Sequence, residues 1–164
     1  MAISVPSKSA QYTNYAASPR VMNDARDWGS KVRVSYAKLT FTEAGFTTAA
    51  AGDIKLIRMP PGKVRILSDL SRLLCPAGTA TSDLDIGIGA YKNNAGTVVA
   101  LDGIALADSL DVGAGALDQA LPLPTGGFLE VESQEGFDVV ASFDTANSPA
   151  TGDFVLAIAY QIGN

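Results

Sequence analysis

The chain has 164 residues, 47% of them hydrophobic, which is enough for one domain with a sizeable core. It contains no histidine and a single cysteine, Cys75, so an internal disulfide framework, histidine-based nucleophile arrangements and histidine or multi-thiolate metal sites are excluded. Charge is sorted along the chain. Residues 1–72 hold 11 Lys and Arg against 5 Asp and Glu, a formal charge of +6, whereas residues 73–164 hold one base, Lys92, against 12 acids, a charge of −11.

This sorting predicts a basic region that docks on an acidic partner surface and an acidic region that keeps an assembly soluble. For the acidic half, an ordinary soluble surface is the alternative. The chain has no run of 18 uncharged apolar residues and no apolar stretch of a secretory signal near its start. We therefore expect it to act where it is made, or in a particle assembled there.

Residues 1–31 predict an extended arm, and residues 32–164 a separate body. The arm is rich in Ser, Ala, Asn and Gln, is broken by Pro6 and Pro19, and shows no sustained period. It nevertheless carries residue types that anchor protein–protein contacts: Tyr12, Tyr15, Arg20, Arg26 and Trp28. We expect a neighbouring subunit to hold the arm through these residues. The alternative is an arm folded back on its own body.

The body reads as a series of short β-strands separated by turn residues. The expected strands span residues 32–41, 53–59, 63–67, 84–91, 128–134, 137–143 and 153–162. Pro60-Pro61-Gly62 predicts a hairpin or corner, Glu135-Gly136 predicts a short hairpin turn, and a phase change near Tyr36 and Ala37 predicts a bulge.

Two strands are especially informative. The segment LDIGIGAY (84–91) places Leu84, Ile86, Ile88 and Ala90 on one face and small residues, Gly87 and Gly89, on the other, which predicts close approach of another backbone or subunit. The segment DFVLAIAYQI (153–162) is apolar on both faces, which predicts an interior strand covered on both sides. Residues 97–121 break the β rhythm, and we expect one or two helical turns there. The predicted fold is all-β, an antiparallel β-sandwich that is jelly-roll-like.

Candidate chemistry is sparse. Cys75 lies in an apolar context and is predicted to be a buried structural thiol. Carboxylates cluster at Asp83 and Asp85 and at Glu130 and Glu132; such pairs could serve glycoside hydrolysis, and the first could bind calcium, but solvated strand faces explain them better. We predict no catalytic residue, no metal and no cofactor, and therefore no enzyme. The glycines of GIGAYK (87–92) lie inside a strand and not at a strand-to-helix turn, so they form no phosphate loop. The acidic body also disfavours nucleic acid as a partner.

Several stretches together resemble the small capsid decoration, or cement, proteins of tailed bacteriophages. They are the polar arm, the strand LDIGIGAY (84–91), the loop with Asp-Gly and LADSLDV (106–112), and the end FDVVASFDTANSPATGDFVLAIAYQI (137–162), with Ala150-Thr151-Gly152 as the turn of a final hairpin. The resemblance covers about residues 70–160.

This resemblance implies a jelly-roll-like, oligomeric subunit on the capsid exterior that staples neighbouring major capsid subunits. It implies the major capsid protein and a second copy of the chain, as a trimer or dimer, for partners, with no membrane. The alternatives are a phage tail- or fibre-associated adhesin that binds host glycans and, last, a carboxylate-based glycosidase.

Overall fold

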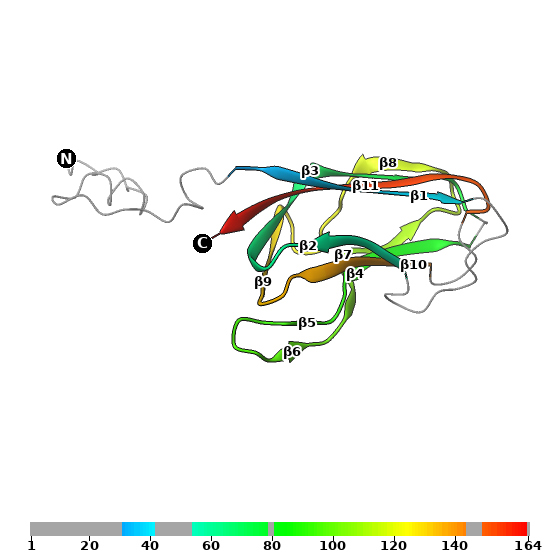
Figure 1. The fold of residues 1–164 in the computed structure, drawn as a ribbon. Coiled ribbons are helices and arrows are strands. Elements are labelled where there is room, and N and C mark those ends of the chain that lie inside the picture. The colour runs from blue at the N-terminus through cyan, green and yellow to red at the C-terminus, as the bar shows by residue number, and fades with distance from the viewer. Residues whose placement is uncertain (1–30, 42–53, 79–80, 144–148, 164) are drawn as a thin grey trace, which may run out of the picture.

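The computed structural model describes residues 31–41, 54–78, 81–143 and 149–163, and in these ranges every regular element is a strand (Figure 1). No helix that could span a membrane occurs among them. The strands are β1 (Arg33–Phe41), β2 (Ile54–Met59), β3 (Gly62–Cys75), β4 (Asp83–Ile88), β5 (Tyr91–Lys92), β6 (Val98–Val99), β7 (Asp102–Asp111), β8 (Leu117–Ala120), β9 (Phe128–Ser133), β10 (Phe137–Phe143) and β11 (Gly152–Gly163).

The strands form two packed antiparallel sheets and a small hairpin. Sheet A has the order β1-β11-β3-β8, with β9 also paired to β3, and sheet B has the order β2-β10-β4-β7. Figure 1 shows the two sheets as layers, with the β5–β6 hairpin projecting beyond sheet B. Strands from the two ends of the chain pair in a nested way: β1 with β11, β2 with β10, β3 with β9 and β8, and β4 with β7. This is the winding of a jelly roll, so the predicted fold class is confirmed.

Alternation along the strands fills the space between the sheets with apolar side chains. In β11, Phe154, Leu156 and Ile158 are at most 2% exposed, and they pack with Phe137 and Phe143 of sheet B in one core. The predicted interior position of β11 between two partner strands is confirmed. Its other face is less covered than expected, because Val155 and Ala157 are only half-buried.

The long strand β3 contains a bulge where it pairs with β11. The register jumps from Ala157↔Arg72 to Ala159↔Leu67. Ser71 repairs the interrupted ladder: its hydroxyl accepts a hydrogen bond from the Ala159 amide at 3.0 Å and donates one to the Leu67 carbonyl at 2.6 Å. The bulge therefore keeps its backbone groups satisfied while β3 changes partner from β9 to β8.

Two local predictions are wrong. The register of β1 with β11 runs without a shift, so there is no bulge near Tyr36 and Ala37; the phase change arises because Val34 and Tyr36 point out of the sandwich. Residues 97–121 contain β6, β7 and β8 in place of helical turns, because cross-strand pairing with β4 and β3 outweighs local preference.

The two predicted C-terminal hairpins are wrong for one topological reason. Strands β9, β10 and β11 alternate between sheet A and sheet B, so consecutive strands do not pair. Gly136 makes a corner between the sheets with φ of +82°, and a side chain there would meet the Met59 carbonyl oxygen. Pro60-Pro61-Gly62 makes the second such corner, between β2 and β3, as one of the two predicted options.

The glycine face of β4 is covered by the chain itself. A Cβ atom on Gly87 would lie 2.1 Å from the Asp102 carbonyl oxygen of β7, and one on Gly89 would lie 3.4 Å from the Asp138 Cβ atom. The predicted close approach therefore occurs, but for Gly87 the approaching backbone is β7 and not another subunit.

Candidate docking surface

The five predicted anchor residues, Tyr12, Tyr15, Arg20, Arg26 and Trp28, lie outside the described residues, as does most of the arm. The structure instead explains what the charge sorting does in the body. Eight Lys and Arg residues between positions 31 and 72 are described, and six of them form ion pairs with acids from residues 118–153.

Each of the outer strand pairs has its own ion pairs. Lys38 meets Asp153 between β1 and β11, Lys55 and Arg58 meet Asp138 between β2 and β10, Lys63 and Arg65 meet Glu130 and Glu132 between β3 and β9, and Arg72 meets Asp118 between β3 and β8. Because the jelly roll pairs strands from the two halves of the chain, opposite charges sorted along the sequence meet across the sheets. Six of the eight described bases of residues 31–72 are thus paired within the body, and docking of this region on an acidic partner stays a prediction.

The paired bases lower the pKa of two of these carboxylates, Glu130 and Asp138. The pKa of Glu130 is lowered, chiefly by the hydrogen bond from Arg65 and further by Lys63, against a raising effect of burial. For Asp138, burial opposes ionisation, but hydrogen bonds from Arg58 and Lys55 outweigh it and the pKa is lowered. Both groups therefore stay ionised and paired at neutral pH.

The outer face of sheet A carries a belt of apolar side chains. Val34, Ala159, Leu67 and Phe128 are directly opposed in one row across four strands, and Tyr36 lies beside Ala157 in the next row. Val34 is 64% exposed, Tyr36 62% and Phe128 50%. We call Val34, Tyr36, Leu67, Phe128, Ala157 and Ala159 the apolar belt. Leu70, in the bulge of β3, is a further exposed leucine, at 61%.

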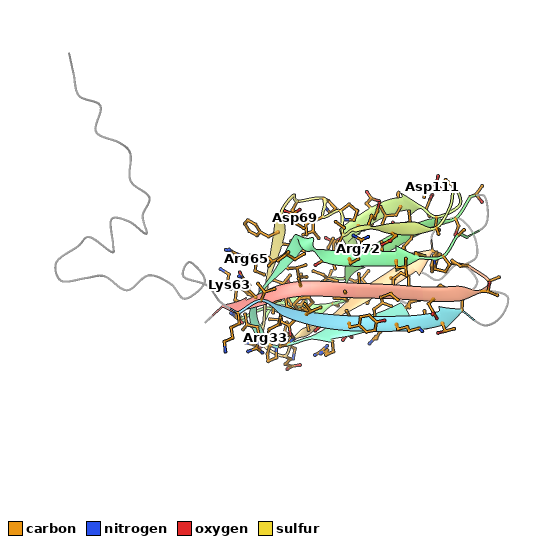
Figure 2. All side chains as sticks on the ribbon, turned by 90° about the horizontal axis from the view of Figure 1, so that it is seen from above. Arg33, Lys63, Arg65, Asp69, Arg72 and Asp111 are labelled. Carbon is orange, nitrogen blue, oxygen red and sulfur yellow. The ribbon has the colours of Figure 1, made fainter. Side chains whose placement is uncertain are left out.

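Ion pairs border the apolar belt on the same face. Figure 2 looks down on this face, with β11 between β1 and β3 and with Lys63, Arg65 and Arg72 along β3. The Arg65 guanidinium carbon lies 4.6 Å from the centre of the Phe128 ring and so joins the border to the belt. Four bases (Lys38, Lys63, Arg65, Arg72) and four acids (Asp118, Glu130, Glu132, Asp153) pair there. An apolar centre with a polar, charge-balanced border is the anatomy of a protein–protein interface.

The remaining candidate residues show no assembled chemistry. Glu130 and Glu132 are both bound to the Lys63 ammonium, at 3.1 and 3.2 Å. Asp85 is buried, and its carboxylate accepts a 2.7 Å hydrogen bond from the Ser109 amide, which holds Ser109 at a φ of +49°. Within the described residues, no three His, Cys, Asp or Glu side chains gather as a metal site would require. Cys75 is fully buried as predicted, and burial raises its pKa to about 12.

Comparison with known proteins adds little to this geometry. No family model matches the chain, and no curated protein matches it. One chain in the structure of infectious bursal disease virus, Gx strain, is similar to this protein, with 15% sequence identity and a TM-score of 0.36. The matched region covers 82% of this protein and 38% of the viral chain. That similarity is too low to support an argument about function.

The apolar belt is not among the features predicted from the sequence, although the first strand carries a signal for it. Val34 and Tyr36 interrupt the alternation of the first strand, and the structure shows that large apolar side chains occupy outward positions there. The members of the belt come from β1, β11, β3 and β9, so only the tertiary pairing brings them together.

Proposed function

We propose that the protein is a non-enzymatic structural virion protein. In this proposal it binds the outer surface of a phage capsid, on the virion exterior, and staples neighbouring major capsid subunits so that the head is stabilised. The observation that carries the proposal is the apolar belt with its charge-balanced border. The jelly-roll winding supports it by analogy, because viral capsid domains are among the proteins that use this fold.

The belt fits a second copy of this chain better than it fits an acidic or basic partner. The whole chain has a formal charge of −5, so most contacts between two copies would oppose like charges. On the outer face of sheet A this repulsion is reduced, because four ion-paired bases are matched by four ion-paired acids, with exposed Asp69 of β3 as a further acid. The homo-oligomer, a trimer or dimer, would therefore form through the belt, and residues 1–31 would contact the major capsid protein through Tyr12, Tyr15, Arg20, Arg26 and Trp28.

Two variants separate the two contacts. The double variant Tyr36→Ser/Phe128→Ser should remain folded, since both side chains are exposed, but should run as a smaller species in light scattering coupled to size exclusion. Deletion of residues 1–28 should leave the sandwich intact and abolish co-sedimentation with empty capsid shells. Truncating a buried aromatic anchor typically costs about 2–4 kcal/mol of binding.

One experimental outcome would contradict the role of the arm, and another would contradict the role of the belt. If the truncated protein sediments with shells as the full chain does, the arm is not the anchor. Val98→Ser, at an exposed apolar residue outside the belt, is the control and should keep the oligomeric state of the parent. If Tyr36→Ser/Phe128→Ser also keeps that oligomeric state, the belt is not the contact between copies. The alternative function, a phage tail- or fibre-associated adhesin that binds host surface glycans, predicts no binding to shells by either form.

A further inference from the structure

A cleft of about 290 Å³ lies between the β5–β6 hairpin and the corner that joins β9 to β10. Its walls include Arg58 of β2, Tyr91 and Lys92 of β5, Val98 of β6, and Glu135 of the corner. None of its lining residues belongs to the apolar belt, and Figure 1 shows the β5–β6 hairpin on the side of sheet B that faces away from sheet A. Its volume is near the lower end of the range for small-molecule sites, about 300–1,000 Å³.

The hairpin wall of the cleft is held in place by hydrogen bonds. The Gln134 amide donates to the Lys92 carbonyl at 3.0 Å, and the Gln134 side chain donates to the Asn94 carbonyl at 3.1 Å. Within the hairpin, the Asn93 carboxamide oxygen accepts hydrogen bonds from the Ala95 and Thr97 amides at 3.0 and 2.9 Å. A two-residue strand pair would be weak by itself, so these bonds are what holds the hairpin wall in place.

Tyr91 gives the cleft a fixed aromatic surface. Its ring packs on the buried Phe137 ring with centroids 5.9 Å apart. Burial raises the pKa of Tyr91 above its ordinary value of 10.0, so its hydroxyl stays protonated at physiological pH. Together with Val98, this ring offers apolar contact of the kind that the face of a sugar ring uses.

The polar part of the cleft has two bases, Arg58 and Lys92, and one acid, Glu135, and Arg58 already forms an ion pair with Asp138. Lys92 is the single base in residues 73–164, and among the described residues it has no ion-pair partner. Arg58 is oriented by two hydrogen bonds, to the Asp138 carboxylate at 3.0 Å and to the Glu135 carbonyl at 2.7 Å, which leaves other guanidinium N–H groups for a ligand. The Glu135 carboxylate is the acid of the wall, and it would accept hydroxyl hydrogens and disfavour a polyanion.

We propose that this cleft binds an acidic sugar that has one carboxylate. Lys92 and Arg58 would receive the carboxylate, Tyr91 and Val98 would contact the ring, and Glu135 would accept a hydrogen bond from a ring hydroxyl. Such binding would give the particle contact with acidic glycans. It is independent of the proposed docking of the belt and the arm, because it uses residues of neither.

The test is an amide chemical-shift titration of the full ¹⁵N-labelled chain with N-acetylneuraminic acid and, separately, glucuronic acid. We expect at least one of the two acids to shift the amides of residues 90–92 and 135–136. The methyl ester of the same acid, which keeps the ring and lacks the charge, should bind about tenfold more weakly, as should Lys92→Gln with the acid. Lys31→Gln, at an exposed lysine outside the cleft lining, is the matched control and should bind like the parent.

Each contrary outcome is decisive. Equal binding of acid and ester would show that the carboxylate is not recognised, and an unaltered Lys92→Gln titration would remove the proposed cation. Acetate binding as tightly as the sugars would mean that the ring contributes nothing. Absence of shifts with both acids would overturn the proposal, whatever the shell-binding experiments give.

Discussion

The ion pair between Arg65 and Glu130 should contribute measurably to folding, because it is better shielded than the Arg72–Asp118 pair of the same sheet. The Arg65 Nε–H donates to Glu130 Oε1 at 2.7 Å, and the Lys63 ammonium lies 3.1 Å from Glu130 Oε2. The side chains of Arg65 and Glu130 are 28% and 27% exposed, against 62% and 60% for Arg72 and Asp118. The second pair has the same cross-strand arrangement and is the natural control.

The magnitude follows from burial and geometry. Exposed pairs give about 0.2–1 kcal/mol, and hydrogen bonds to charged groups about 1.5–3 kcal/mol. We expect Glu130→Ala to lower the free energy of unfolding by about 1–2 kcal/mol, since Arg65 would lose its acceptor while Lys63 keeps Glu132 at 3.2 Å. The coupling energy between Arg65→Ala and Glu130→Ala should be about 1 kcal/mol, and that of the Arg72–Asp118 pair at most about 0.5 kcal/mol.

Urea unfolding of the four proteins in each double-mutant cycle measures both coupling energies. The pH dependence gives a second readout. Because the folded-state pKa of Glu130 is lowered below its ordinary value of 4.5, its stabilising effect is fully present above that value and is lost as the pH falls through the folded pKa. The difference between parent and Glu130→Ala should therefore shrink in acid. A coupling energy indistinguishable from zero for Arg65 and Glu130, or one equal to that of Arg72 and Asp118, would show that burial does not strengthen this ion pair.

Three further predictions concern the core. Ile158→Asp places an unpaired carboxylate at a fully buried position, which costs several kcal/mol of a total stability of about 5–15 kcal/mol. Circular dichroism should therefore show an unfolded chain. The control Ala157→Asp, on the outer face of the same strand, should fold. Gly87→Ala should destabilise by more than about 2 kcal/mol in urea unfolding because its methyl group meets the β7 backbone at 2.1 Å; Gly127→Ala, with open space around it, should not. Cys75 should be unreactive toward a thiol reagent at pH 8 in the folded state and react on unfolding, since its pKa is about 12; reaction of the folded protein at the unfolded rate would contradict this burial.

Three features could be predicted from the amino-acid sequence: the all-β class, the interior position of residues 153–162 and the burial of Cys75. Each depends on a local pattern: alternation of apolar residues, turn residues at short intervals, and an apolar neighbourhood. The same patterns could not say which strands pair. The predicted final hairpins were wrong because Glu135-Gly136 is compatible both with a hairpin and with a corner between sheets, and the choice depends on partners far along the chain.

The partners of the sorted charges and of the outward apolar residues depend on the tertiary fold. Nested pairing brings Lys38, Arg65 and Arg72 against acids that lie 46 to 115 positions later in the sequence. Opposite charges that are separated along the chain therefore form ion pairs across neighbouring strands. The same pairing aligns Val34 with Phe128 through two intervening strands. Periodicity reports on which face a residue lies, but only the register between strands decides which residues become neighbours, and both the belt and the cleft are made of such neighbours.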